Sequence, residues 1–219
     1  MTAEILAMAR EHVGREGAAA LSLRSIARDL GMAPSALYRY FDGRDALLSA
    51  LILTAYESLA ETAEAAAREA QGRRGSDAER FSTVPRAMRE WALGHPHEWG
   101  LIFGTPVPGY QAPEDTVVPY ARIAAAMVRP VVEADGAGRL RPRHGVEVPP
   151  ELALAVEPVS EGLLPGMPVA TVVRVVQAWT TVVGIVSLEV FGHWRNTIGD
   201  PGALFEGTVR DLAGSLGLE

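Results

Sequence analysis

The amino-acid sequence predicts an all-α protein, and three observations lead to this fold class. Apolar residues recur at helical spacing along most of the chain, and no segment alternates apolar and polar residues as a half-buried strand does. Proline and glycine gather in a few stretches between the periodic segments, notably residues 104–114 and 135–150. The most apolar run, residues 169–191, is too long for a strand and contains no turn signal.

The periodic segments give the expected order of helices. We expect helices at residues 3–16, at two short segments around Gly31, and at residues 44–69, 84–93, 98–103, 115–133, 151–156, 169–194 and 201–216. Residues 135–150 are expected to be disordered or to form a lid. We predict two domains, residues 1–48 and 49–219, joined by the helix at 44–69 and not by a flexible linker.

The segment from Leu21 to Leu48 carries the clearest functional pattern. Ser22 is a suitable N-cap for one short helix, because its hydroxyl can accept from free backbone N–H groups. Gly31 suits a left-handed turn, and Pro34 suits the first turn of a second helix. Leu37 and Phe41 are spaced to face inward. This is a helix-turn-helix pattern, and its second helix is short and polar enough to enter a DNA major groove.

These residues resemble the DNA-binding domain of TetR-type transcriptional repressors. The resemblance runs in fixed register through Ile26-Ala27, Leu30-Gly31-Met32, Leu37-Tyr38-Arg39-Tyr40-Phe41, Arg44 and Ala46-Leu47-Leu48. Beyond Leu48 the chain matches only in layout, as a long helical domain. More loosely, Trp91, His95-Pro96 and the region from Gly100 to Gly104 resemble a subgroup whose ligand domain carries a Trp, His, Gly signature.

The candidate DNA contacts come partly from chemistry and partly from the resemblance. Arg39 can pair with guanine O6 and N7, and Ser35 can reach a base edge or a phosphate. The resemblance implies phosphate contacts from Tyr38, from Arg44, and from Ser22 with Arg24, where a helix dipole also favours an anion. The predicted DNA-binding set is Ser22, Arg24, Pro34, Ser35, Tyr38, Arg39, Tyr40 and Arg44. The alternative is an ordinary surface helix whose aromatic residues, Tyr40 above all, pack against the first helix.

The charge distribution suits a DNA binder only after the chain is divided. The net charge is −7, but residues 1–50 hold as many arginines as acidic residues, so the remainder carries the whole excess. We call the predicted DNA-binding domain, residues 1–48, the reader. An acidic second domain next to a reader of zero net charge weakens non-specific DNA binding, so that affinity depends on a few arginines that contact DNA. Only Met1 and Thr2 precede the first predicted helix, so minor-groove contacts from a basic arm are not expected.

A set of large apolar residues in the second domain has two open interpretations, plain core packing or the lining of an apolar ligand cavity. The resemblance favours a cavity, since the second domain of this family usually binds a small effector. The predicted ligand-binding set is Tyr56, Leu59, Trp91, His95, Trp99, Phe103, Tyr120, Met127 and Trp179. The expected effector is a small, mostly apolar molecule whose identity the residues do not give.

Several other classes of site are not expected. The chain has no cysteine, which excludes disulfides, thiolate metal sites and cysteine nucleophiles. His95 and His97 lie on different helical faces, so no metal site is predicted. With no G-x-S-x-G elbow and no phosphate-binding glycine loop, we predict neither an enzyme nor a cofactor.

A membrane span and a signal peptide are not expected either. Arg174, Gln177 and Glu189 interrupt the most apolar run, and the N-terminus has no basic segment followed by an apolar core. We therefore expect a cytoplasmic protein.

The sequence thus predicts a ligand-responsive transcriptional repressor. As a homodimer it binds a palindromic operator in double-stranded DNA, and a small apolar effector releases it. The resemblance implies dimerisation through the last two helices. A regulator that activates instead of repressing stays open. The alternative from another class is an all-helical ligand-binding or interaction protein without DNA binding.

Overall fold

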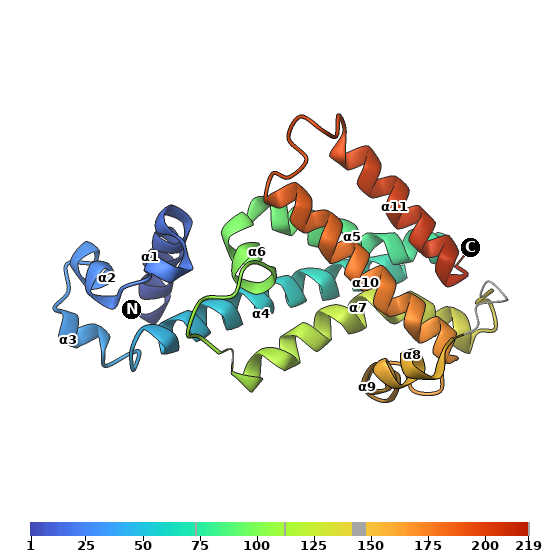
Figure 1. Cartoon of the computed structure of the whole chain (residues 1–219), viewed down its shortest axis with the longest axis horizontal. Helices are drawn as coiled ribbons and strands as arrows, with labels where there is room; N and C mark the ends of the chain where they lie inside the picture. Colours follow the sequence, from blue (N-terminus) through green and yellow to red (C-terminus); the bar gives the residue numbers. More distant parts are fainter. Residues whose placement is uncertain (73, 112, 142–147, 219) are drawn as a thin grey trace. The chain divides into compact units, whose positions relative to one another are not determined.

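The computed structural model describes residues 1–72, 74–111, 113–141 and 148–218 (Figure 1). All regular secondary structure in these ranges is helical, which confirms the predicted all-α class. The elements are α1 (Thr2–Glu16), η1 (Ala18–Ala20), α2 (Leu23–Asp29), α3 (Pro34–Leu37), α4 (Arg44–Gly72), α5 (Asp77–Gly94), α6 (Pro96–Phe103), η2 (Glu114–Thr116), α7 (Val117–Gly136), α8 (Pro150–Ala155), α9 (Glu157–Gly162), α10 (Val169–Val190) and α11 (Pro201–Leu216).

The chain divides into two compact units. The N-terminal unit comprises Met1–Ser58 and Gly94–Tyr120, and the C-terminal unit comprises Leu59–Leu93 and Ala121–Glu219. Helix α4 begins in the first unit and ends in the second. The domain boundary near residue 48 stays a prediction.

The core of the N-terminal unit joins α1, α2, α3 and the start of α4. Its buried apolar residues include Ile5, Ala9, Ile26, Leu37, Leu47 and Leu51. Residues of α6 and of the loop after it also pack on this core, namely Leu101, Ile102, Val107 and Tyr110. The Tyr110 hydroxyl lies 3.0 Å from Ser49 Oγ, which fastens the loop to α4.

Helix α6 approaches α1 closely at Gly14. A Cβ atom at this position would lie 3.0 Å from Cδ2 of His97, which is tighter than nearly all real Cβ contacts. A side chain at residue 14 would therefore require the exposed His97 ring to shift by a few tenths of an ångström.

Helix α5 starts seven residues before the predicted position, so the expected start at Val84 is wrong. The reason is a reciprocal cap that the sequence analysis did not use. The Glu79 amide donates to Ser76 Oγ at 3.2 Å, and the Ser76 amide donates to Glu79 Oε2 at 2.8 Å. Pro85 lies within the helix without ending it.

In the C-terminal unit, α10 and α11 form an antiparallel hairpin (Figure 1). Arg174 of α10 donates to the carbonyl of Ser215 in α11 at 2.6 Å. The predicted bounds of α11 are confirmed, and Asp200 caps it by accepting from the Ala203 amide at 2.9 Å. The expected continuation of α10 to Trp194 is wrong, because Gly192 is left-handed, with φ 75°, and the His193 amide donates to the Leu188 carbonyl at 2.9 Å, which ends the helix in a Schellman motif.

Among the described residues, α10 has the length and composition of a membrane-spanning helix. Its mean hydropathy is 1.7 over an 18-residue segment, and 39% of that segment is buried. One such helix is weak evidence for a span, since a core helix of a soluble protein passes the same test. Helix α9, which begins beside Pro158, was not predicted. Of residues 135–150, expected to be disordered or lid-like, residues 142–147 lie outside the described residues. For residues 135–141 the expectation is wrong, because α7 continues to Gly136 and the Arg141 amide donates to the Gly217 carbonyl at 2.9 Å.

Candidate functional site

The turn between α2 and α3 has the geometry that the sequence predicts. Gly31 is left-handed, with φ 65°, and its amide donates to the Arg28 carbonyl at 3.1 Å. The Met32 amide donates to the Ala27 carbonyl at 2.8 Å, which completes a Schellman motif. Ser22 occupies the N-cap position of α2, but its side chain makes no capping hydrogen bond.

Helix α3 presents polar and aromatic side chains outward from an apolar base. Leu37 is fully buried and Phe41 is 8% exposed, whereas Tyr38 is 49% and Tyr40 46% exposed. The backbone keeps turning beyond α3, since the Tyr40 and Phe41 amides both donate to the Leu37 carbonyl. The other exposed members of the predicted DNA-binding set on this segment are Pro34, Ser35 and Arg39.

Arg24 and Arg44 differ in what they contact. Arg24 is exposed in the first turn of α2. The Arg44 guanidinium donates to the carbonyls of Ala18 and Ala19 at 3.1 and 3.2 Å. These bonds tie the first residue of α4 to η1. A phosphate contact from Arg44 stays a prediction, and about a third of its side chain, 32%, remains exposed for one.

One polar contact within the N-terminal unit was not expected from the sequence. His12 is 3% exposed, and its Nε2 lies 2.7 Å from Oδ2 of Asp29, the last residue of α2. The hydrogen bond from His12 lowers the pKa of the Asp29 carboxyl, with a further contribution from Arg28. His12 shares the inward face of α1 with Ile5 and Ala9, so its helical spacing could have marked it as buried.

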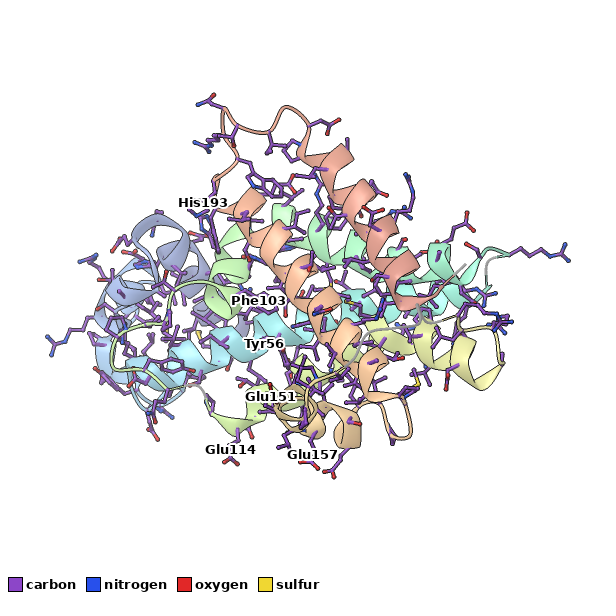
Figure 2. All side chains as sticks on the ribbon, turned by 45° about the vertical axis from the view of Figure 1, so that its right-hand side comes forward. Tyr56, Phe103, Glu114, Glu151, Glu157 and His193 are labelled. Atoms are coloured by element: carbon purple, nitrogen blue, oxygen red, sulfur yellow. The ribbon has the colours of Figure 1, made fainter. Side chains whose placement is uncertain are left out.

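Four of the predicted ligand-binding residues meet as an aromatic cluster in the N-terminal unit. The Tyr56 ring stands edge-on to those of Phe103 and Tyr120, with both centroids 6.2 Å away. The Trp99 and Phe103 centroids lie 4.4 Å apart. Figure 2 shows Tyr56 on α4 and Phe103 on α6 pointing toward one another. The cluster consists of Tyr56, Trp99, Phe103 and Tyr120.

A hydrogen bond anchors the cluster. The Tyr56 hydroxyl donates to the Ile102 carbonyl at 3.2 Å, and burial raises the pKa of Tyr56. Trp99 is fully buried, whereas Tyr120 is 38% exposed. The cluster therefore reaches from the core of the N-terminal unit to its surface.

The remaining predicted ligand-binding residues are distributed differently. Leu59, Trp91 and Met127 are buried in the C-terminal unit, and Trp179 is partly exposed there. His95 belongs to the N-terminal unit, where it is exposed just before α6. The structure thus brings four members of the predicted set together, leaves His95 outside the cluster in the same unit, and places the other four in the C-terminal unit.

Comparison with known proteins identifies the family. Residues 5–51 match the family model described as bacterial regulatory proteins, tetR family, and residues 81–212 match the model of a tetracyclin repressor-like C-terminal domain. The chain belongs to the TetR family. It is 36% identical over 217 residues to the HTH-type transcriptional regulator Rv1816 of Mycobacterium tuberculosis, which covers 98% of this chain and 91% of the relative. The regulator Mb1846 of Mycobacterium bovis matches with the same values.

Solved structures agree with this assignment. The putative regulatory protein SCO4313 superposes with a TM-score of 0.78 at 36% identity and covers 97% of this chain and 95% of that one. A Rhodococcus protein of unknown function has the same fold, with a TM-score of 0.73 at 24% identity over 99% of this chain and 95% of that one.

Membership of the TetR family confirms the predicted class of protein. The chain is a transcription regulator with a DNA-binding helix-turn-helix, in a family that is not enzymatic. In the part of the chain that the structure describes, no group of three or more His, Asp or Glu residues could hold a metal ion.

Proposed function

We propose that this TetR-family regulator is a repressor that binds a palindromic operator as a homodimer and is released by a small apolar effector. The observation that carries the proposal is the outward face of α3. Ser35, Tyr38 and Arg39 are exposed over the buried base of Leu37 and Phe41. A short helix held by an apolar base can present such side chains to a major groove in a fixed orientation.

The proposed contacts divide into base reading and backbone positioning. Arg39 reads a guanine through its two-pronged guanidinium, and Ser35 contacts a neighbouring base edge or phosphate. Tyr38, Tyr40 and Pro34 lie against the backbone, while Ser22 and Arg24 approach a phosphate at the start of α2. Arg44 contributes mainly by anchoring η1, since two carbonyls already occupy its guanidinium.

The hairpin of α10 and α11 supports the proposed homodimer. One stripe of α10 is apolar or small yet accessible in the single chain, including Val169, Val183, Leu188 and Phe191. Leu204 of α11 is likewise 40% exposed. Two such hairpins would bury these residues in a four-helix bundle. The dimer would place two copies of α3 in major grooves about one helical turn, ~34 Å, apart.

The aromatic cluster supports the proposed effector site. Tyr56 lies on α4, the same helix whose first residue, Arg44, binds η1 within the reader. A ligand that moves Tyr56 or the packed rings of Phe103 and Tyr120 would act on α4 directly. It would weaken operator binding by a coupling free energy of about 1–3 kcal/mol. We place this regulator in the cytoplasm, where its operator lies.

A gel-shift assay with DNA flanking the protein's own gene tests the proposed operator binding. We expect a saturable complex that competitor DNA of unrelated sequence does not displace. A panel of apolar metabolites is then titrated against tryptophan fluorescence and against the complex. Quenching with the complex left intact would contradict release by that ligand, and no specific complex would contradict the repressor.

Light scattering on the full-length chain tests the proposed dimer. We expect a dimer for the wild type, and monomers or aggregates for Val183→Asp, which puts a charge on the accessible stripe of α10. Val118→Asp is the matched control, because Val118 is 66% exposed on α7 and outside the hairpin. A stable, dilute wild-type monomer would refute the dimer.

A further inference from the structure

A groove in the C-terminal unit is lined by arginines that neither the reader nor the aromatic cluster uses. It lies between the end of α4 and the first turns of α5 and has a volume of about 250 Å³. Arg74, Arg80 and Arg86 line it, together with Ala70, Glu79 and Thr83. This concentration of positive charge stands out in a chain whose net charge is −7.

Arg80, which lines this groove, has an unsatisfied donor. Its Nε is buried and has no hydrogen-bond partner within the described part of the chain. Its nearest carboxylate, Asp77, is 3.6 Å from Nη1 and already accepts two hydrogen bonds from Arg139 at 2.8 and 3.1 Å. Because a buried N–H without an acceptor is costly, such a group in a native protein calls for a partner from outside the chain.

The carboxylates around the groove are committed elsewhere. Glu79 accepts from the Ser76 amide in the cap of α5, and Glu206 binds Arg86 through three contacts of 2.6 to 3.0 Å. Arg74 is exposed and forms no ion pair with any residue that the structure describes. Arg74 and Arg80 therefore offer cationic donors whose charge the neighbouring acids do not fully take up.

A single water molecule is the simplest competing partner for Arg80. A void of about 10 Å³ lies next to Arg80, lined also by Ala70, Val84 and Pro130. Such a void has room for about one water. However, one water in the void would leave Arg74 and the larger groove without a role.

We propose that this groove binds the oxyanion end of a small molecule, a phosphate or a carboxylate, with Arg80 Nε and Arg74 as the donors. Arg forks match the planar, paired oxygens of both groups. The site is separate from the proposed apolar effector site. It would make the C-terminal end of α4 sensitive to an anion, while the other end of the same helix begins in the reader.

The test uses the full-length protein and the Nε–Hε signals of arginine in ¹H–¹⁵N spectra. Inorganic phosphate and acetate are titrated separately against chloride at constant ionic strength. We expect a saturable shift of the Arg80 signal with at least one of the two anions. Tighter binding of phosphate would assign the site to phosphorylated molecules, and tighter binding of acetate would assign it to carboxylates.

Variants distinguish specific anion binding in this groove from non-specific electrostatic attraction of anions to arginine side chains. We expect Arg80→Gln and Arg74→Gln each to weaken binding about tenfold, the typical loss for a charge-assisted hydrogen bond. Arg68→Gln removes the same charge from α4, outside this groove, and should change affinity less than about twofold. Arg74 is exposed, so its variant is informative even if Arg80→Gln does not fold.

The absence of a saturable shift with either anion would overturn the proposal and leave a water as the partner of Arg80. Equal affinity of the Arg74→Gln and wild-type proteins would overturn it too. Neither result bears on operator binding, which the gel-shift assay measures independently.

Discussion

Arginines serve opposite purposes in the two units. In the C-terminal unit, Arg86, Arg89, Arg122 and Arg139 are each held by a carboxylate through two or more hydrogen bonds. In the N-terminal unit, Arg24 and Arg39 are exposed and form no ion pair with the residues that the structure describes. The fork of a guanidinium can fasten two helices or recognise a ligand, but one fork cannot fully do both.

Arg44 and Arg80 lie between these extremes. Arg44 is in the reader, but its guanidinium donates to two backbone carbonyls. Arg80 is in the C-terminal unit, but its buried Nε has no hydrogen-bond partner among the described residues. The partners of a guanidinium are therefore a better guide to its role than the unit in which it lies.

The largest effect is expected from breaking a shielded pair. In the Arg89–Glu189 pair the side chains are only 22% and 13% exposed, and Arg89 also lies 5.3 Å from the Phe205 ring centroid. Arg89→Ala leaves a shielded carboxylate without its partner, and we expect the free energy of unfolding to fall by about 2–3 kcal/mol. Urea denaturation curves of the two proteins, fitted with the same m-value, measure the change.

The matched control for that variant is Arg86→Ala. The Arg86–Glu206 pair has the same bidentate geometry, but its side chains are 46% and 39% exposed. Because solvent screens exposed pairs, we expect a loss below about 1 kcal/mol. Equal losses from the two variants would show that burial does not set the strength of these pairs.

Arg39→Ala should act on recognition and leave folding unchanged. We expect the affinity for the preferred operator to fall by about 1–3 kcal/mol, with relaxed base preference at one position in each half-site. Binding to a set of single-base operator variants measures both effects. Arg195→Ala, an exposed arginine between α10 and α11, is the control. If Arg39→Ala weakened every sequence equally, Arg39 would be a backbone contact instead.

Arg44 separates an anchoring role from a phosphate contact. Arg44→Ala removes two hydrogen bonds to carbonyls, and we expect a loss of about 1–2 kcal/mol in stability. Arg44→Lys keeps the charge but loses the fork, so it should not restore stability. A phosphate contact would instead lower the slope of log K against log salt by about one in Arg44→Ala, with recovery in Arg44→Lys.

The smallest effect concerns the contact between His12 and Asp29. The pKa of Asp29 is lower in the folded protein than in the unfolded chain, so its contribution to stability is present above the unfolded pKa, about 3.9. It is lost as the pH falls through the lowered folded value. The stability difference between wild type and Asp29→Asn should therefore shrink below about pH 4. A difference that stays constant down to pH 2 would exclude ionised Asp29 as the stabilising species.

Two features that depend on residues close together in the chain were predicted correctly from the sequence. Helix α11 was predicted with its observed bounds, because Asp200 caps its start and Gly217 is left-handed just after its end. The outward face of α3 followed from helical spacing alone. The start of α5 was missed because the cap formed by Ser76 and Glu79 was overlooked.

Contacts between distant residues were not predictable in this way. The Arg44 guanidinium reaches carbonyls twenty-five and twenty-six residues earlier, and His12 meets a carboxylate seventeen residues later. Such pairs depend on how helices pack, which periodicity does not specify. The predicted ligand-binding set was also grouped by residue type alone. In the structure its members are divided between the two compact units.

The contact between α1 and α6 at Gly14 has a consequence for how this sequence can evolve. A methyl group at residue 14 would require the His97 ring to move by a few tenths of an ångström, so a change at one position affects the other although they lie far apart in the chain. Homologues that keep this helix contact should vary in step: where residue 14 has gained a side chain, residue 97 should be smaller. Such paired substitution in related sequences would be evidence of the contact between the two helices.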